Sequence, residues 1–372
     1  ADLGDGFFEQ LKVRLGYSDY THTEFEGDAV GTVFDVESFE ARVELVQSDT
    51  GPGTGAFGAQ YTYRDFAALG EEAFVAPNTT NQFALFGLQE FGTGPFQLET
   101  GARLEFTDAE SAPLGVSRSF TNFSGALGFV YETDEALRAG VNFSRVERAP
   151  SAEELFAGGP HIATQQFEIG NPDLNSESAW GVEGFLRGQV GGANVSFAIY
   201  RQWFNNYIYL SANGAEEADL PVFLILQQDA GYFGIEGELS FPVYRTGRSS
   251  VIADLRASYI DAELDDGTAV PRIPPVELLG ALEHQSDAVD VRGEVQWFGE
   301  QDDVAAIETP TDSFTFVNFS VAWRPMPDFE NVTLILNADN VFDVVGRRNA
   351  SFAKDFVPLG GRNFRASVRM SF

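Results

Sequence analysis

Histidines surrounded by carboxylates are the side chains in this sequence best suited to chemistry, and the chain holds only 3 of them. His161 follows a Gly-Gly-Pro turn inside the longest irregular stretch, residues 146–176. A neutral imidazole beside carboxylate oxygens suits zinc or another borderline cation. The alternative is that His161 only fixes the shape of its loop. The candidate ligand-binding residues are His161, Glu153, Glu154, Glu168 and Asp173.

The other two histidines have weaker surroundings. His22 lies close in sequence to Asp19 and Glu24, near the expected end of a strand, so His22 and Glu24 form a second candidate metal site. The same alternative, a structural role, applies to this pair. His284 stands beside Glu283 near an expected turn and predicts no site.

Other motif-like segments do not predict cofactor sites or catalysis. Residues 261–267 space carboxylates like a calcium loop, but Asp266 stands where an EF-hand requires Gly, so an acidic hairpin with weak cation binding is expected. Residues 53–58 match GxGxxG without a following helical pattern and indicate a turn. The sequence contains no HExxH, no GxSxG and no plausible Ser/His/Asp order. We therefore expect neither an enzyme nor a bound cofactor.

The composition narrows the partners of the chain. The 372 residues include 23 Lys+Arg and 56 Asp+Glu, a formal net charge of −33, so the chain lacks the basic footprint that nucleic acids require. Cysteine is absent, which excludes disulfides and thiolate zinc sites. With 44% apolar residues and 13% aromatic residues, the chain can nevertheless bury a core.

Strict alternation of apolar and polar residues dominates the chain. In residues 289–297 every odd position is apolar or Gly and every even position is polar, and residues 96–106 and 364–372 nearly repeat this pattern. A period of two gives a strand one apolar and one polar face. Counting such segments predicts about 16 or 17 strands, by strand signals alone. One exception, residues 150–158, has the Ser-x-x-Glu pattern of a short capped helix.

Two all-β architectures fit this alternation. A soluble secreted sandwich or propeller, binding a ligand or calcium, would turn the apolar faces inward. A transmembrane antiparallel β-barrel would turn them toward lipid. The longer segments have the roughly 9–11 residues that a tilted membrane strand needs, and aromatic residues such as Tyr200, Trp203 and Tyr207 crowd expected strand ends like an interfacial girdle. The sequence contains no run of about 18 apolar residues, so it predicts no transmembrane helix. These features favour the barrel.

Three groups of motifs resemble the barrel of the TonB-dependent outer-membrane receptors. Residues 145–157, continued by 170–177, resemble the signature R-x-P-x-x-x-E-L-(Y/F) with G-N-P-x-L-x-x-E, and residues 270–275 resemble the lead into a late strand. Residues 337–343 with 358–364 resemble the closing motifs before the last strand. The matching positions are Arg148, Pro150, Leu155, Gly170, Asn171, Pro172, Pro271, Pro274, Asn340, Phe342, Gly361 and Arg362, with Phe372 as the terminal aromatic residue.

This resemblance implies a receptor in the outer membrane of a Gram-negative bacterium that imports a metal ion or metal chelate. Residues 16–24 and 159–172 also resemble a subgroup that includes zinc-uptake receptors. Expected partners are membrane lipid and lipopolysaccharide, the barrel-assembly machinery, and TonB acting through a plug domain. Such barrels have 22 strands, so we expect residues 1–372 to be an N-terminally incomplete barrel without its plug.

Overall fold

Long strands that pair with their sequence neighbours make up most of the chain. The computed structural model describes residues 1–4, 6–48, 53–70, 72–133, 137–325 and 332–370. The elements in this part are β1 (Phe8–Glu26), β2 (Ala29–Gln47), β3 (Gly53–Gly70), β4 (Asn78–Thr93), β5 (Phe96–Ser111), β6 (Val116–Glu132), β7 (Arg138–Arg148), α1 (Ala152–Phe156), β8 (Gly158–His161), η1 (Ile162–Thr164), β9 (Gln166–Ile169), β10 (Glu177–Val190), β11 (Ala193–Glu217), β12 (Leu220–Arg245), β13 (Ser249–Leu264), β14 (Glu277–Ser286), β15 (Val289–Phe298), β16 (Phe314–Trp323), β17 (Val332–Asp339) and β18 (Asn363–Met370).

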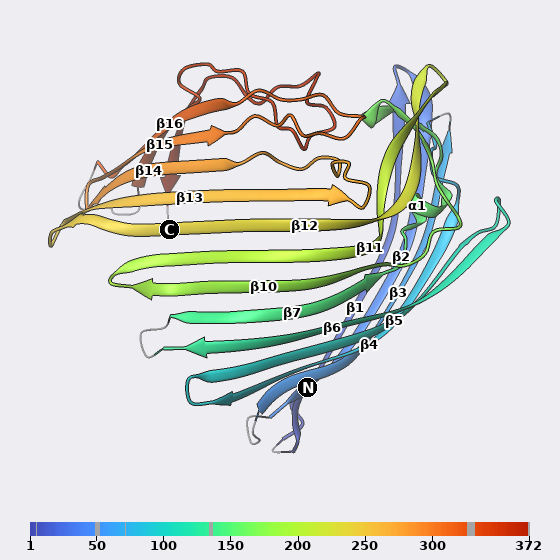
Figure 1. Ribbon diagram of the computed structural model, residues 1–372, viewed down its shortest axis with the longest axis horizontal. Helices are drawn as coiled ribbons and strands as arrows, with labels where there is room; N and C mark the ends of the chain where they lie inside the picture. The colour runs from blue at the N-terminus through green and yellow to red at the C-terminus, as the bar shows by residue number, and fades with distance from the viewer. Residues whose placement is uncertain (5, 49–52, 71, 134–136, 326–331, 371–372) are drawn as a thin grey trace.

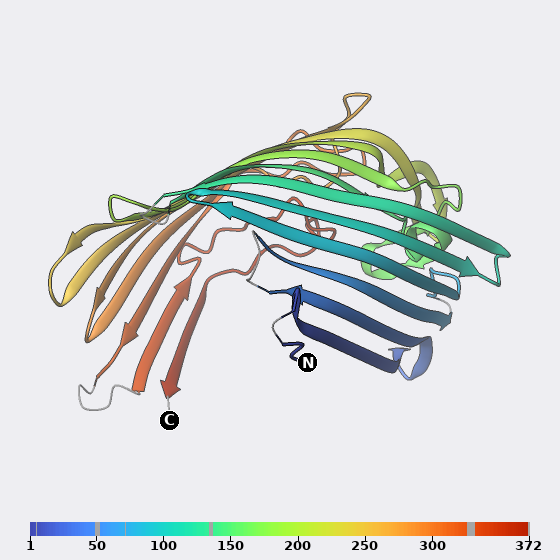
Figure 2. The same ribbon diagram turned by 90° about the horizontal axis from the view of Figure 1, so that it is seen from below.

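All of these strands except β8 and β9 form one antiparallel meander, and β9 pairs in parallel with β12. Neighbouring strands pair with one another from β1 through β7, and again from β10 through β18. β7 pairs directly with β10, because β8 and β9 lie in the loop between them. The sheet curls into a deep arch, with its N-terminal and C-terminal strands on opposite sides (Figures 1 and 2).

The described residues contain 18 strands where the alternation predicts 16 or 17. The difference comes from β8 and β9, which have 4 residues each and are too short to show a period of two. The capped helix expected within residues 150–158 is confirmed as α1. In the described part of the chain, no helix has the length and apolar character needed to cross a membrane.

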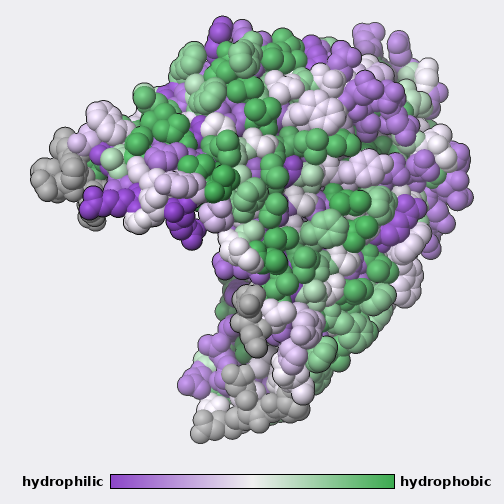
Figure 3. Space-filling view, turned by 60° about the vertical axis from the view of Figure 1, so that its left-hand side comes forward, coloured by the Kyte–Doolittle hydropathy of each residue, from purple (hydrophilic) through white to green (hydrophobic). Residues whose placement is uncertain are grey.

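The apolar face of the sheet points outward. On β1, Val13, Leu15 and Tyr17 are 53%, 71% and 65% exposed, and hydrophobic residues spread over the face seen in Figure 3. The opposite face carries ion pairs within single strands, such as Arg103 with Glu105 on β5. A soluble sandwich would bury its apolar face, whereas a membrane barrel exposes it to lipid. The fold is therefore all-β and of the membrane-barrel type, and the soluble alternative is not favoured.

The connections separate the sheet into two ends. Short turns, including residues 191–192, 246–248 and 287–288, lie at one end, which we name the turn end. The long loops 149–176, 265–276, 299–313 and 340–362 lie at the other, which we name the loop end, because antiparallel strands place alternate connections together.

The principal apolar cluster lies where the loop 149–176 folds against the inner face of the sheet. Leu155 and Phe156 of α1 are each 1% exposed. They pack with residues from several strands and from the loop itself, namely Phe66, Phe120, Leu174, Ile208 and Ile225. This packing fixes the loop that carries the predicted ligand-binding residues.

Candidate functional site

A capping box starts the helix of the loop 149–176. The Glu154 backbone N–H donates to Ser151 Oγ at 3.2 Å, and the Ser151 N–H donates back to the Glu154 carboxylate at 2.7 Å. These two bonds satisfy helix N–H groups that have no partner within the helix. The helix ends at Phe156, and its apolar residues face the cluster described above.

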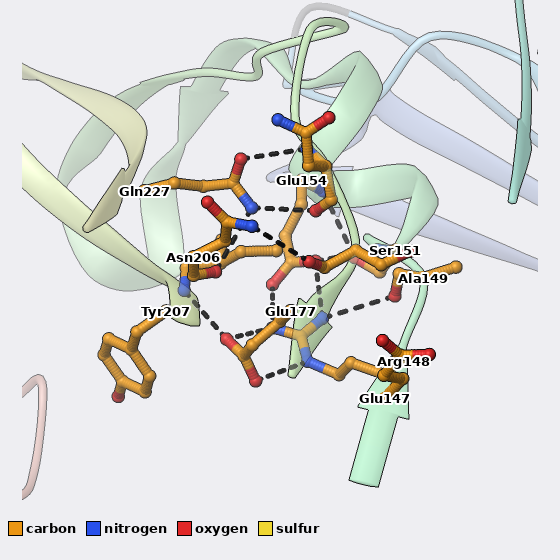
Figure 4. A network of polar contacts seen from close by, with 12 residues as sticks. Glu147, Arg148, Ala149, Ser151, Glu154, Glu177, Asn206, Tyr207 and Gln227 are labelled. Atoms are coloured by element: carbon orange, nitrogen blue, oxygen red, sulfur yellow. Dashed lines mark hydrogen bonds and ion pairs between the residues drawn. The ribbon is translucent and has the colours of Figure 1, made fainter. Parts of the chain in front are cut away.

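Arg148 ties this helix to the sheet. Its guanidinium donates to both carboxylate oxygens of Glu154, at 2.8 and 2.9 Å, and to both of Glu177, at 3.0 and 3.2 Å (Figure 4). Glu177 also accepts the backbone N–H of Ile208 on β11 at 2.8 Å. The motif spacing of Arg148, Glu154 and Glu177 thus has a physical meaning: one guanidinium joins β7, α1 and β10 through two bidentate pairs.

Gly170 lets the returning chain pass close to α1. Its N–H donates to the Ala157 carbonyl at 2.8 Å, and a Cβ at this position would lie 2.7 Å from the Ala157 nitrogen. The next residue, Asn171, donates its N–H to the Glu154 carbonyl at 2.9 Å and accepts the Asp173 N–H at 2.9 Å. Pro172 lies within this turn. The G-N-P segment therefore shapes the loop, and Asp173 lies exposed at its surface.

His161 and Glu168 form a dyad between β8 and β9. His161 Nδ1 lies 2.8 Å from a carboxylate oxygen of Glu168, and the imidazole stacks on Phe74 with the centroids 4.2 Å apart. Glu168 is 7% exposed. Both residues come from the loop that the sequence singles out, so the structure brings this pair together.

The remaining acidic candidates of the loop have other partners. Glu153 lies 3.3 Å from Arg64 on β3. Burial favours a higher pKa for Glu153, but hydrogen bonds from its own N–H and from Ser151, together with the charge of Arg64, hold the pKa below its ordinary value. Glu154 is bound to Arg148 as described. The five candidates therefore do not converge on one point, and their assignment to a ligand stays a prediction.

The second candidate site and the acidic hairpin are less organised. His22 Nε2 lies 3.8 Å from Glu24, while the imidazole stacks on Phe34 at 4.5 Å. In the hairpin, hydrogen bonds from the Thr268 hydroxyl and N–H lower the pKa of Asp266 below its ordinary value. Across the described ranges, no group of three or more His, Cys, Asp or Glu residues is placed to hold a metal ion.

A polar centre that the sequence did not reveal joins three other loops. Lys354 is 4% exposed, and its ammonium donates to the Thr309 carbonyl and to Asn349 Oδ1, both at 2.6 Å. Asn349 donates in turn to the carbonyl of Ile273 at 3.0 Å. Burial lowers the pKa of Lys354, and the charges of Glu308 and Asp355 oppose this shift. Loops 265–276, 299–313 and 340–362 are thereby linked.

Replacing Lys354 with alanine is expected to destabilise these three loops by about 2 kcal/mol, because the buried Asn349 Oδ1 and the Thr309 carbonyl both lose their donor. Limited proteolysis of the detergent-solubilised protein measures the effect as faster cleavage in loop 340–362. Lys12→Ala is the matched control, since Lys12 is 41% exposed in its side chain and lies 4.0 Å from Glu44. Equal cleavage rates in the two variants would contradict the prediction.

The later motif residues fix the ends of these loops. Asn340, 3% exposed with a φ of +47°, donates to the carbonyls of Val344 and Gly360 and accepts the Val344 N–H. Arg362, which follows Gly361, donates its N–H to Asp343 at 2.8 Å. Pro271 and Pro274 lie on either side of Ile273, whose carbonyl accepts the hydrogen bond from Asn349. Phe342 is 72% exposed. Phe372 lies outside the described residues.

The expected aromatic girdle is partly wrong at the loop end. Trp203 is 47% exposed, as a girdle residue should be. Tyr207 and Tyr209 instead pack beside Phe204 and Tyr232 against a second buried cluster. A register shift between Phe204 and Tyr207 changes which face the following residues occupy.

The fold and the motifs agree with comparisons to known proteins. The family model "TonB dependent receptor-like, beta-barrel" matches residues 1–341. The copper transporter OprC is 16% identical with a TM-score of 0.83, over all of this chain and 64% of that one. The FrpB iron transporter from Neisseria meningitidis (F3-3 variant) is 14% identical with a TM-score of 0.75, over 99% of this chain and 61% of that one.

A third structure is a mutant of the ferric enterobactin receptor PfeA from Pseudomonas aeruginosa, in complex with enterobactin. It is 17% identical with a TM-score of 0.73, over 99% of this chain and 60% of that one. At such identities the likeness shows the fold. The chain spans less than two thirds of each of these three proteins. By its family match, by the motifs and by its fold, the chain belongs to the TonB-dependent receptors, within their β-barrel domain.

Proposed function

We propose that this chain forms the wall and outer loops of a receptor that imports a scarce metal, as the ion or as a chelate of the zinc or iron–siderophore type. The observation that carries the proposal is a sheet with an exposed apolar outer face and an ion-paired inner face, crossed at the loop end by the folded loop 149–176. A ligand that binds at the loop 149–176 and then moves inward would pass along the polar inner face of the sheet. The transporters with similar folds carry copper, iron and enterobactin in their names, which supports a metal or chelate.

The same proposal specifies location and partners. The exposed apolar face would contact lipid and lipopolysaccharide in the outer membrane of a Gram-negative bacterium, after insertion by the barrel-assembly machinery. We assign residues 1–372 to the barrel, so TonB would act through a plug domain, which none of the described residues forms. The role is transport and not catalysis.

His161, Glu168 and Asp173 are the proposed ligand contacts of the loop 149–176. Asp173 is exposed, and the His161–Glu168 dyad is held in place by stacking on Phe74. Glu153 and Glu154 support the loop through Arg64 and Arg148. His22 and Glu24 remain a second proposed cation contact, 3.8 Å apart on β1.

Uptake by the native host tests this function. Deleting the gene is expected to abolish the uptake of one metal form when that metal is scarce enough to limit growth. Uptake is measured with radioactive iron chelate, copper or zinc. The gene should restore uptake in a strain with TonB and should fail to restore it in a strain without TonB. Unchanged uptake of every metal form after deletion, or rescue that is independent of TonB, would overturn the proposal. Heat-modifiable migration on SDS gels checks that the protein is a folded barrel in each strain.

A further inference from the structure

The outer face of the sheet changes from apolar to polar near the loop end. The register places four residues of this face directly opposite one another on β7, β10, β11 and β12, namely Arg145, Trp180, Trp203 and Gly231. Trp180 is 56% exposed and Trp203 is 47% exposed. Nearer the turn end, a row that we name the apolar belt consists of Ala139, Leu186, Phe197 and Gly237. Exposed tryptophans beside an apolar belt are typical of the boundary between lipid tails and headgroups.

Arg201 lies on this outer face, within the boundary. On β11 it stands two positions after the exposed Ile199 and two before Trp203, and the register shift of this strand comes only after Phe204. A Cβ at Gly231 would lie 2.8 Å from Arg201 Nη2, so the guanidinium extends over the glycine that lies opposite Trp203. Because Gly231 has no side chain, it leaves the room that this guanidinium occupies.

The charge of Arg201 is not compensated. Among the residues that the structure describes, its guanidinium forms no ion pair and no hydrogen bond. Arg145 on the same face, by contrast, pairs with Glu147 and donates to the Phe123 carbonyl at 2.9 Å. An unpaired guanidinium on a lipid-facing surface is costly unless it lies at headgroup level. Arg201 is therefore a positive charge at the boundary that has no partner within the described part of the chain.

Acidic residues limit where an anion bound to Arg201 could lie. Asp261 and Glu263 stand on the same face of β13, opposite Phe233 and Gly231. In the described ranges, neither of them forms an ion pair with Arg201. These carboxylates would repel an anion on the side of β13. An anion held by Arg201 would thus lie on the opposite side, over Trp203 and toward Trp180.

A phosphate group on a lipid fits this position. A guanidinium binds phosphate with two parallel hydrogen bonds, and an indole ring combines an apolar body with one N–H donor. A soluble anion would leave the neighbouring apolar belt uncovered. A lipid would bring its phosphate to Arg201 while its acyl chains cover the belt. Charge complementarity and continuity with the apolar belt therefore both indicate a phosphorylated lipid.

We propose that Arg201 binds a phosphate group of lipopolysaccharide, that Trp203 and Trp180 pack against its headgroup, and that its acyl chains cover the apolar belt. This proposal rests on the proposed function in taking the loop end to face the outside of the outer membrane, where lipopolysaccharide forms the outer leaflet. The bound lipid would lie beside β10 and β11. The first of these strands is joined directly to the loop 149–176, so the lipid would support the wall below that loop.

Native mass spectrometry of the full-length receptor in detergent tests the proposal. The probes are lipid A (the phosphorylated anchor of lipopolysaccharide), dephosphorylated lipid A and phosphatidylglycerol. Arg201→Gln is expected to weaken binding of lipid A about tenfold or more, the effect of losing hydrogen bonds between two charged groups. Trp203→Leu should weaken it less. Arg256→Gln is the matched control, because Arg256 lies on the inner face beside Glu238, at 3.5 Å, and the change of charge is the same.

Four results would overturn the proposal. They are unchanged lipid A affinity in Arg201→Gln, an equal loss in Arg256→Gln, equal affinity of the wild type for lipid A and its dephosphorylated form, and phosphatidylglycerol bound as tightly as lipid A. If Arg201→Gln fails to show heat-modifiable migration, the two forms of lipid A compared on the wild type decide. Metal uptake separates this proposal from the proposed function: intact TonB-dependent uptake without lipid A binding contradicts only the lipid site, whereas lipid A binding without metal uptake contradicts only the transport role.

Discussion

Replacing Arg148 with alanine should loosen the whole loop 149–176 and destabilise it by about 3 kcal/mol. The substitution leaves the carboxylates of Glu154 and Glu177 without a counter-charge, and Glu177 is only 9% exposed. Both carboxylates also accept backbone N–H groups, from Ser151 and Ile208, so neither can turn toward water without losing another bond. The loop would then separate from β10 and β11. Cleavage by a glutamate-specific protease, followed over time in detergent, measures this opening.

Three further variants identify the cause. Arg348→Ala removes an exposed arginine from loop 340–362 and should leave the cleavage rate unchanged. Arg148→Lys should have an intermediate effect, because an ammonium cannot make two bidentate pairs. Combining Arg148→Met with Glu154→Gln and Glu177→Gln should recover part of the stability, since no unpaired charge is left. A triple variant less stable than Arg148→Ala would show that charge compensation is not the source of the effect.

Replacing Gly170 with alanine should cost about 2 kcal/mol by pushing the returning chain away from α1. A Cβ at Gly170 would lie 2.7 Å from the Ala157 nitrogen, 2.9 Å from the Leu155 carbonyl carbon and 3.0 Å from the Phe156 nitrogen. All three are backbone atoms, which cannot turn aside as a flexible side chain can. The shift would weaken the bond from the Gly170 N–H to the Ala157 carbonyl and displace the buried Leu174.

The same loop offers the control for this prediction. A Cβ at Gly158 would meet nothing within 4 Å, and its φ is not in the left-handed region, so Gly158→Ala should change stability by less than about 0.5 kcal/mol. Hydrogen exchange of the amides in residues 155–174 distinguishes the two variants. If Gly170→Ala exchanged as slowly as the wild type, the close approach at Gly170 would not be needed for the loop to fold.

The long strands and α1 could be predicted from the sequence because their signals are local. Alternation of apolar and polar residues reports the two faces of a strand. The capping box of α1 needs only Ser151 and Glu154, three positions apart. The motif around Arg148 could likewise be found as a resemblance, although its residues Arg148, Glu154 and Glu177 lie on three different elements.

Other features depend on contacts that no local pattern encodes. Lys354, Thr309 and Ile273 come from three loops that meet only after the strands between them have paired. The prediction that Tyr207 faces outward was wrong for a different reason. Between the pairs of Phe204 and Tyr207, two residues on β11, Asn205 and Asn206, oppose one residue on β12, and Asn206 has a φ of +55°. The extra residue shifts the alternation, so an odd-numbered residue that should face outward faces inward.

Because β9 pairs in parallel with β12, the loop end can finish folding only after β12 has been added to the sheet. Residues 167–169 of β9 pair with residues 222–224 of β12, more than fifty positions later in the chain. β13 pairs with β12 only from Ala230 onward, so β9 covers an edge that would otherwise stay free. Contacts between distant segments form after local ones. During insertion into the membrane, the wall can therefore assemble strand by strand, whereas a molecule arrested before β12 lacks the strand against which β9 of the loop 149–176 pairs.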